Sequence, residues 1–158
     1  MERELLEKEV VTIVEELIGK MGFEATVTIK NGEEEGKDVI ICDIRTEDSN
    51  FLIGQYGLNL QSLQHIVRVM MRKRIEEPVN FILDVNSYRQ EKNESIVRLA
   101  KNLAEEVVAG KKEIVMRPMT AYERRIVHME LSKNELIKTE SIGEGESRRI
   151  VVKPMELA

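Results

Sequence analysis

The amino-acid sequence predicts an α+β protein made of two small modules that follow one another along the chain. Three observations support this prediction. Residues 3–85 read as helix, strand, strand, helix, helix, strand, with a pair of glycines between the second and third helices. A long amphipathic helix follows at about 87–109, and a shorter helix and a strand pair complete the chain. The length of 158 residues, 42% of them hydrophobic, suits one ordinary domain or two small ones.

The composition narrows the classes of protein. Aromatic residues make up 4% of the chain and Trp is absent, which disfavours a surface rich in stacked rings. The single cysteine, Cys42, excludes an internal disulfide and a multi-cysteine zinc site, and its apolar neighbours predict a buried thiol. The sequence has no signal-peptide segment and no apolar stretch of membrane length, which predicts a soluble, cytoplasmic protein without membrane insertion.

The net charge of −5 is unevenly distributed. Residues 1–36 hold ten acidic residues against four basic ones, while acids and bases nearly balance in the remainder. The excess of acid therefore belongs to the N-terminal end, and the rest of the chain is free to form basic surfaces.

The first three predicted elements form a helix followed by two strands. Residues 3–21 have apolar side chains at helical spacing and end near Gly22, which predicts an amphipathic helix. Residues 23–30 alternate between apolar and polar, as a half-buried strand does. Asn31 to Gly36 is predicted to be a turn or the tip of an elongated hairpin, and residues 39–44 a second strand covered on both faces.

The next elements surround the sequence Gly54-Gln55-Tyr56-Gly57. A short helix at 50–53 leads into it, and a helix at about 58–74 follows it and ends in three basic residues. Pro78 blocks further helix, so that residues 79–85 are predicted to form the third strand. These elements make one compact α+β unit, to which we assign residues 1–86.

The second module, residues 87–153, begins with the long helix. Asn86 and Ser87 are predicted to cap that helix, with Gln90 as the reciprocal member of a capping box. Because no flexible linker precedes the helix, we expect it to be a rigid joint between the two modules.

The rest of the second module is a helix and a hairpin. Thr120 and Glu123 form a second predicted capping box, which opens a helix. Residues 135–141 and 147–152 are predicted to pair as strands, and the tail 154–158 to be loose.

The glycine-framed corner, residues 54–57, is the first candidate site. A helix start presents unpaired backbone N–H groups and the positive end of the helix dipole, and glycines let a phosphate approach them. A nucleic-acid strand is the ligand that fits such a corner. The alternative is an ordinary turn that binds nothing, because paired glycines are common in turns.

Basic side chains in the second module form the other candidate site. Arg124 and His128 are four residues apart and share one helical face, where a guanidinium and an imidazole can hold two phosphate oxygens. The alternative is a solvated face without a ligand. Arg125 points elsewhere on the helix. Arg148 and Arg149 occupy successive strand positions, so at most one of them faces Arg124.

An enzyme is the first alternative to a binding protein. In principle His128 could act as a general base on a phosphodiester, beside Arg124 and Glu123 or Glu130. The sequence shows no metal-ligand cluster, no Walker loop and no dinucleotide fingerprint. We therefore expect a protein that is not an enzyme and needs no metal or cofactor.

Motifs in both halves resemble known families. Six helices and strands, with Gly54-Gln55-Tyr56-Gly57 between the second and third helices, are similar in order to a KH domain of the bacterial type II topology, α-β-β-α-α-β. Residues 122–128 and 140–149 resemble a small α+β R3H domain, which is named for an Arg and a His separated by three residues. Both halves in this order, from about residue 3 to 153, resemble the Jag (SpoIIIJ-associated, KhpB) family of bacterial RNA-binding proteins. Longer members of that family carry an additional N-terminal domain, for which the printed sequence has no room.

The resemblance implies binding of single-stranded RNA, with single-stranded DNA as the alternative ligand. Residues 54–57 would form the KH loop, and Arg124 and His128 would be the named R3H pair, helped by Arg125 and by one of Arg148 or Arg149. The resemblance places Ile53, Leu60 and Leu63 as candidates for the apolar base groove of a KH domain, although each could equally belong to the core.

One departure concerns the KH loop. Many KH loops have a Lys or Arg between the glycines, whereas this one has Gln55 and Tyr56. Phosphate contacts would then depend on backbone N–H groups, the Gln55 amide and the Tyr56 hydroxyl. We therefore expect weaker binding with a shallower salt dependence.

The second functional hypothesis is an interaction scaffold. The resemblance implies pairing with a second small KH protein, self-association, or action beside cell-envelope machinery as a regulator. The acidic first helix suits a basic partner.

Overall fold

The computed structural model of the chain describes residues 2–155. The chain divides into two compact units, Met1–Arg89 and Gln90–Ala158, with the boundary inside the helix α4 (Tyr88–Gly110). Both units combine helices with a three-stranded sheet, which confirms the predicted α+β class.

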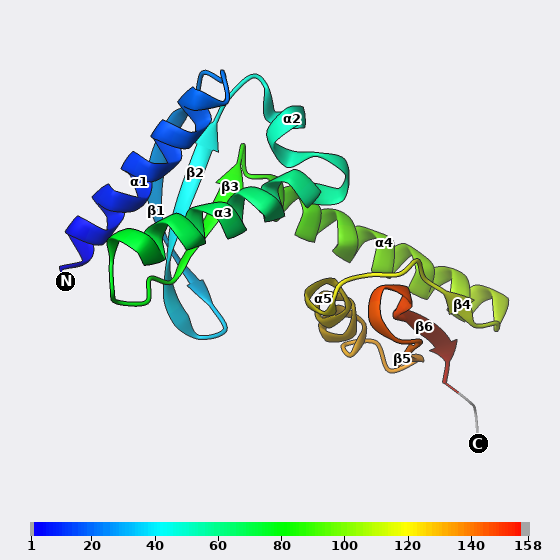
Figure 1. The fold of residues 1–158 in the computed structure, drawn as a ribbon. Coiled ribbons are helices and arrows are strands. Elements are labelled where there is room, and N and C mark those ends of the chain that lie inside the picture. Colours follow the sequence, from blue (N-terminus) through cyan, green and yellow to red (C-terminus); the bar gives the residue numbers. More distant parts are fainter. Residues whose placement is uncertain (1, 156–158) are drawn as a thin grey trace. The chain divides into compact units, whose positions relative to one another are not determined.

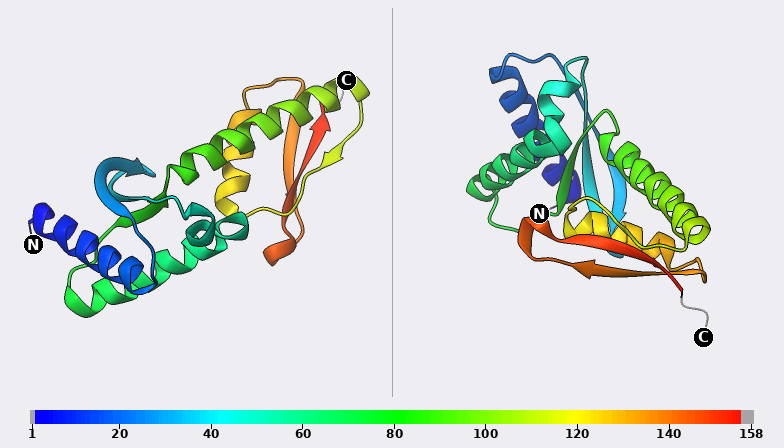
Figure 2. Two further views of the ribbon diagram at one scale, coloured as in Figure 1. Left: turned by 90° about the horizontal axis from the view of Figure 1, so that it is seen from above. Right: turned by 90° about the vertical axis from the view of Figure 1, so that its right-hand side faces the viewer.

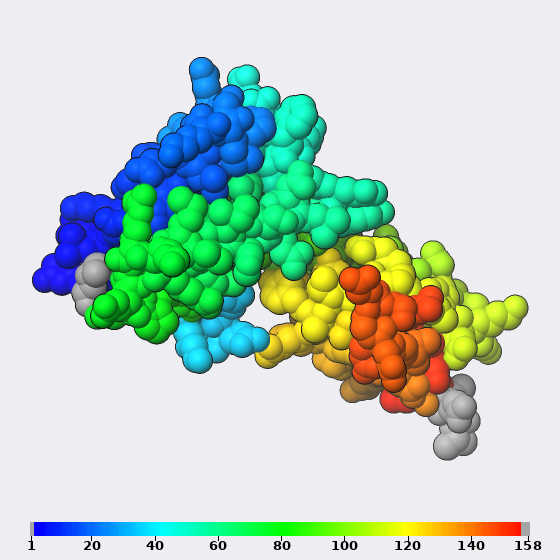
Figure 3. Space-filling view, viewed as in Figure 1, coloured from blue at the N-terminus to red at the C-terminus, as the bar shows by residue number. Residues whose placement is uncertain are grey.

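The first unit has the predicted order of elements (Figure 1). These are α1 (Arg3–Lys20), β1 (Thr26–Glu34), β2 (Lys37–Arg45), α2 (Ser49–Ile53), α3 (Leu58–Arg74) and β3 (Phe81–Val85). The sheet order is β1-β2-β3, in which β2 pairs antiparallel with β1 and parallel with β3. Helices α1 and α3 lie side by side and cover one face of this sheet (Figures 1 and 3).

The core of the first unit lies between those helices and the sheet. Cys42 on β2 is fully buried there, as predicted, and burial raises the pKa of its thiol to about 12, with smaller contributions from the negative charges of Asp43 and Glu15. The buried Gln64 of α3 is bonded to β3 through both ends of its amide. Its Nε2 donates to the Phe81 carbonyl at 2.9 Å, and its Oε1 accepts from the Leu83 N–H at 2.6 Å. These two bonds fix α3 against the edge of the sheet.

The β1–β2 hairpin is elongated, which was one of the two predicted alternatives. The strands pair from Thr26↔Arg45 to Glu34↔Lys37, and only two residues form the turn. Glu35 and Gly36 have φ of 52° and 75°. Positive φ at both central positions is typical of the two-residue turns that match strand twist.

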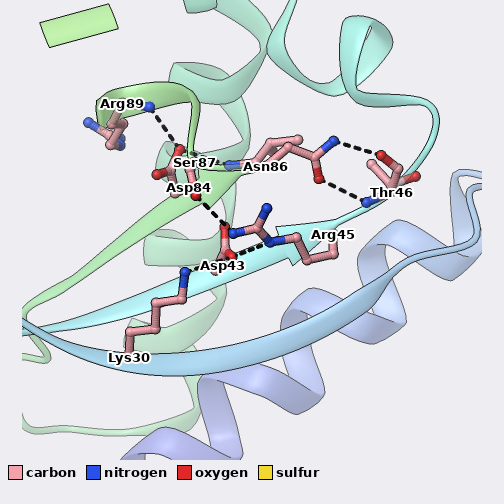
Figure 4. Close-up of polar contacts among 9 residues, drawn as sticks. Lys30, Asp43, Arg45, Thr46, Asp84, Asn86, Ser87 and Arg89 are labelled. Atoms are coloured by element: carbon pink, nitrogen blue, oxygen red, sulfur yellow. Dashed lines mark hydrogen bonds and ion pairs between the residues drawn. The ribbon is translucent and has the colours of Figure 1, made fainter. Parts of the chain in front are cut away.

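The predicted capping box at the start of the long helix is wrong. Asn86 and Ser87 are instead left-handed residues, with φ of 50° and 59°, in the connection from β3 to α4. The Asn86 amide is bonded to the backbone of Thr46, with Nδ2 donating to its carbonyl at 2.7 Å and Oδ1 accepting from its N–H at 3.1 Å (Figure 4). Asp84 Oδ1 accepts the Arg89 N–H at 3.1 Å, while Gln90 donates to Glu94. The tertiary contact with the end of β2 replaces the expected local cap.

The second unit continues from α4 with a sheet of order β4-β6-β5 that is antiparallel throughout. Its elements are β4 (Ile114–Val115), α5 (Ala121–Leu131), β5 (Ile137–Ile142), the 3₁₀ turn η2 (Gly145–Ser147) and β6 (Arg149–Pro154) (Figure 2). The sequence did not predict β4, which is only two residues long. The capping box at α5 is confirmed, because Thr120 Oγ1 accepts from the Glu123 N–H and the Glu123 carboxylate accepts from the Thr120 N–H.

The core of the second unit joins α4, α5 and the sheet, through residues such as Ala100, Val127 and Ile150. Strand β6 includes Pro154, the first residue of the predicted tail, and residues 156–158 of that tail lie outside the described part of the chain. Within residues 2–155, no helix is both long enough and apolar enough to cross a bilayer.

Candidate functional site

The glycine-framed corner lies between α2 and α3, in the 3₁₀ turn η1 (Gln55–Gly57) and the residue before it. Gly54 has φ 70° and ψ −177°, a region that is essentially restricted to glycine, and Gly57 has φ 78°. A Cβ at Gly54 would lie 2.5 Å from the Asn59 side chain, and one at Gly57 would lie 3.0 Å from the Tyr88 ring. Both the backbone conformation and the close neighbours therefore require glycine at these two positions.

Several N–H groups of the corner are already hydrogen-bonded within the chain. The Gly54 N–H donates to the Asn50 carbonyl at 2.9 Å, and the Gly57 N–H to the Gly54 carbonyl at 3.3 Å. The Leu58 N–H donates to the Gln55 carbonyl. The expectation that the corner offers a row of unpaired amides is wrong for these three groups, because the end of α2 uses the Gly54 N–H and the 3₁₀ turn uses the other two. What the corner presents to solvent are the side chains of Gln55 and Tyr56.

The ring of Tyr56 is the most exposed large apolar group of the described residues, with 69% of the residue accessible. The residue has φ 55° and ψ 22°, which is a left-handed conformation that bulky residues rarely adopt. Its position between the two glycines therefore combines strain with exposure.

The apolar residues named as groove candidates divide into two kinds. Leu60 and Leu63 of α3 are 3% and 5% exposed and belong to the core of the first unit, so the core alternative holds for both. Ile53 is only partly buried and packs against that core. Phe51 and Leu58, at either side of the corner, are exposed.

The second candidate site lies in the second unit, where α5 faces β5. Arg124 Nη1 donates to the Met119 carbonyl at 2.6 Å. The two ring nitrogens of His128 both have hydroxyl partners on β5, with Thr139 Oγ1 at 2.6 Å from Nδ1 and Ser141 Oγ at 3.0 Å from Nε2. The imidazole is therefore held by β5 and does not present a vacant nitrogen to solvent.

Electrostatics extend this cluster to a third residue. The pKa of His128 is lowered from its ordinary value of 6.5, first by burial and then by the positive charges of Arg124 and Arg148. The shift favours the neutral ring, in which one nitrogen donates while the other accepts. Arg148, whose Nη1 donates to the Gly143 carbonyl at 2.7 Å, thus belongs with Arg124 and His128.

The other two predicted arginines have different surroundings. Arg125 is exposed on the following position of α5. Arg149 is partly buried at the start of β6, and its Nε is a buried atom without a hydrogen-bond partner. Of the two neighbouring arginines 148 and 149, it is the first whose charge acts on His128.

Sequence reasoning missed Thr139 and Ser141. Both lie on β5 two positions apart, so both side chains leave the same face of the strand. Alternation along the predicted strand was the signal for this pair, but only the pairing of β5 with α5 shows that the face meets His128.

One further contact fixes α5. The capping residue Glu123 is buried, and its carboxylate accepts a charged hydrogen bond from Lys92 of α4 at 2.8 Å. Among residues 2–155, no group of three or more His, Cys, Asp or Glu side chains is placed to hold a metal ion.

Comparison with known proteins identifies relatives for both units. Residues 94–154 match the R3H domain family. Over 150 residues the chain is 29% identical to the RNA-binding protein KhpB of Clostridium symbiosum, a match that covers 95% of this chain and 67% of that protein. It is 34% identical over 143 residues to the RNA-binding protein KhpB of Bacillus subtilis (strain 168), covering 89% and 65%.

A third relative matches a shorter segment. The chain is 36% identical over 107 residues to the RNA-binding protein KhpB of Lactiplantibacillus plantarum, which covers 68% of this chain and 33% of the relative. The chain thus spans between one third and two thirds of the length of these relatives. Their names describe binding proteins, in agreement with the prediction that the chain is not an enzyme. The chain is therefore a homologue of the KhpB (Jag) family over most of its length, with an R3H domain at residues 94–154.

Proposed function

We propose that this chain binds single-stranded RNA in the cytoplasm, with one contact region in each unit. The relatives carry the name of RNA-binding proteins, and the R3H match covers the segment that holds Arg124, His128 and Arg148. The observation that carries the proposal is the convergence of the Arg124 and Arg148 charges on a neutral His128. The cluster consists of two arginines and a histidine and contains no carboxylate. Two guanidinium groups of this kind form a site for a phosphate.

In the R3H unit the three residues have different tasks. Arg124 and Arg148 supply the positive charge that attracts the RNA backbone. His128 acts as a positioning residue, because its two ring nitrogens hold Thr139 and Ser141 and so fix α5 against β5. This assignment replaces the expected Arg–His pair with an Arg–Arg pair.

The first unit is proposed to be a KH domain of the type II topology. The support is its order of elements and its sheet order β1-β2-β3, with a two-glycine corner between α2 and α3. RNA would meet this unit at the exposed side chains of Gln55 and Tyr56, with Ile53 beside them. Because this surface lacks a basic residue, most of the charge-dependent affinity comes from the second unit.

Fluorescence anisotropy with a labelled single-stranded RNA tests the proposal. Replacing both Arg124 and Arg148 with Ala is expected to weaken binding by about tenfold or more, since each charge-assisted phosphate contact contributes roughly 1.5–3 kcal/mol. The control is Arg98→Ala, which removes one arginine charge from an exposed position of α4 and is compared with each single replacement, Arg124→Ala and Arg148→Ala.

Unchanged affinity in the double variant would contradict the proposed phosphate site. A parallel titration with DNA of the same sequence then tests whether RNA is preferred, because only RNA offers a 2′-hydroxyl.

A further inference from the structure

The glycine-framed corner holds an aromatic ring whose role the phosphate contacts leave unexplained. We propose that the exposed ring of Tyr56 stacks on a base of the bound RNA, so that the corner recognises a nucleobase in addition to the backbone. This inference rests on the proposed RNA binding and specifies the ligand chemistry at one point of it.

The conformation of Tyr56 is the first argument. At φ 55° and ψ 22° a turn favours Gly, Asn or Asp, and a bulky aromatic residue costs energy there. The ring does not recover that cost by packing into the core, because the residue is 69% exposed. A strained and solvent-exposed ring is typical of a residue that is selected for a ligand.

The surroundings of the ring favour RNA as that ligand. Tyr56 lies two residues before α3, a helix that contains no acidic residue. The positive end of the dipole of α3 lies at Gly57, the residue that follows Tyr56 in the chain. A phosphate is therefore favoured beside Tyr56, and the base attached to that nucleotide needs an apolar face within a few ångströms.

The chemistry of the corner favours stacking over a charged contact. The residues between the two glycines are Gln55 and Tyr56, and neither carries a charge at neutral pH. Stacking between a base and an aromatic ring is tolerant of sequence and contributes affinity that does not depend on counterion release. The ring thus adds affinity of a different kind from the phosphate contact of a basic loop residue. The low aromatic content of the chain is no objection, because a single well-placed ring is sufficient for one base.

Two substitutions separate the ring from the rest of the residue. Tyr56→Phe keeps the ring and removes the hydroxyl, whereas Tyr56→Asn removes the ring and suits the left-handed backbone. We expect Tyr56→Asn to weaken RNA binding about tenfold and Tyr56→Phe to change it less than about twofold. Thermal unfolding should show both variants folded. Tyr122→Leu is the control, since it removes another exposed tyrosine ring, 55% accessible, from the second unit.

A thermodynamic cycle with the RNA gives the decisive measurement. Oligonucleotides that lack one base at successive positions are titrated against the unaltered chain and against Tyr56→Asn. If stacking occurs, removal of one particular base weakens binding to the unaltered chain about tenfold and does not weaken binding to Tyr56→Asn further.

Three results would overturn the inference. Equal affinity of Tyr56→Asn and the unaltered chain would exclude a contribution from the ring. An equal loss in Tyr56→Phe and Tyr56→Asn would assign the contact to the hydroxyl. If the unaltered chain binds no RNA, the proposed function itself fails and this inference with it, which distinguishes that failure from the other two.

Discussion

The two candidate sites are built in different ways. The corner at residues 54–57 depends on backbone conformation, because positive φ angles at Gly54 and Gly57 shape it and no charged side chain takes part. The cluster in the second unit depends on side-chain charge, because Arg124 and Arg148 extend from α5 and from the connection between β5 and β6. The first site should therefore be sensitive to substitutions that alter the backbone conformation. The second should be sensitive to the charge of its side chains and to ionic strength.

The largest expected effect comes from adding a Cβ at the corner. Gly54→Ala would force a left-handed, extended conformation on alanine and place its methyl group 2.5 Å from Asn59, so we expect a loss of about 1–3 kcal/mol in the free energy of unfolding. Urea denaturation measures this loss. The matched control is Gly145→Ala in the second unit, which also has a positive φ of 57° but has open space around it. Equal losses at the two glycines would show that the corner is no more constrained than an ordinary turn.

An intermediate effect is expected in the salt dependence of RNA binding. The slope of the logarithm of the association constant against the logarithm of the salt concentration is negative, and it should become shallower by about 1.4 when Arg124 and Arg148 are both replaced by Ala, at about 0.7 for each contact with a single strand. Tyr56→Asn should leave the slope unchanged, because stacking releases no counterions. Titrations at several sodium chloride concentrations measure both slopes. A slope that changes in Tyr56→Asn and not in the double arginine variant would contradict this assignment.

The smallest expected effect is a pH dependence from His128. Because burial and two arginines lower its pKa below 6.5, RNA affinity should be constant between about pH 7 and 8, and a phosphate at the site should favour protonation only below pH 6.5. Affinity should therefore increase modestly on acidification and not decrease on passing from neutral to alkaline pH.

Stability should respond in the other direction. The unfolded chain binds the His128 proton more readily than the folded chain, so this contribution to stability is complete above pH 6.5 and decreases as the pH falls. Thermal unfolding of His128→Gln, compared with the unaltered chain at pH 5.5 and 7.5, measures the difference. An unfolding temperature with the same pH response in both proteins would contradict the assignment.

Hydrophobic periodicity was sufficient to predict most elements, because it records which face of each element is buried. It failed where long-range contacts decide the local structure. Asn86 is a residue type that often caps helices, but its amide is bonded to the backbone of Thr46. Thr46 follows the end of β2, far from Asn86 in the sequence. Strand β4 was not predicted, because a strand of two residues is too short to show an alternating pattern of apolar and polar residues.

The site was predictable only in part for the same reason. Helical spacing alone put Arg124 and His128 on one face, and strand alternation alone separated Arg148 from Arg149. The partners of the His128 ring come from β5, and the spacing of residues along α5 contains no information about which strand will face it. The groove candidates show the same limit of periodicity, because the core and a ligand groove share a period of three or four residues. For Leu60 and Leu63 that period marked the core.

The buried Cys42 has a practical consequence for these experiments. Only a thiolate reacts readily with maleimides and similar reagents, and a thiol with a pKa of about 12 in the core forms almost none at neutral pH. Because the chain has no other cysteine, one placed at a chosen surface position would be labelled selectively in the folded protein, without first removing the native one. A fluorophore attached in this way would let the motion of each unit be followed while RNA is added.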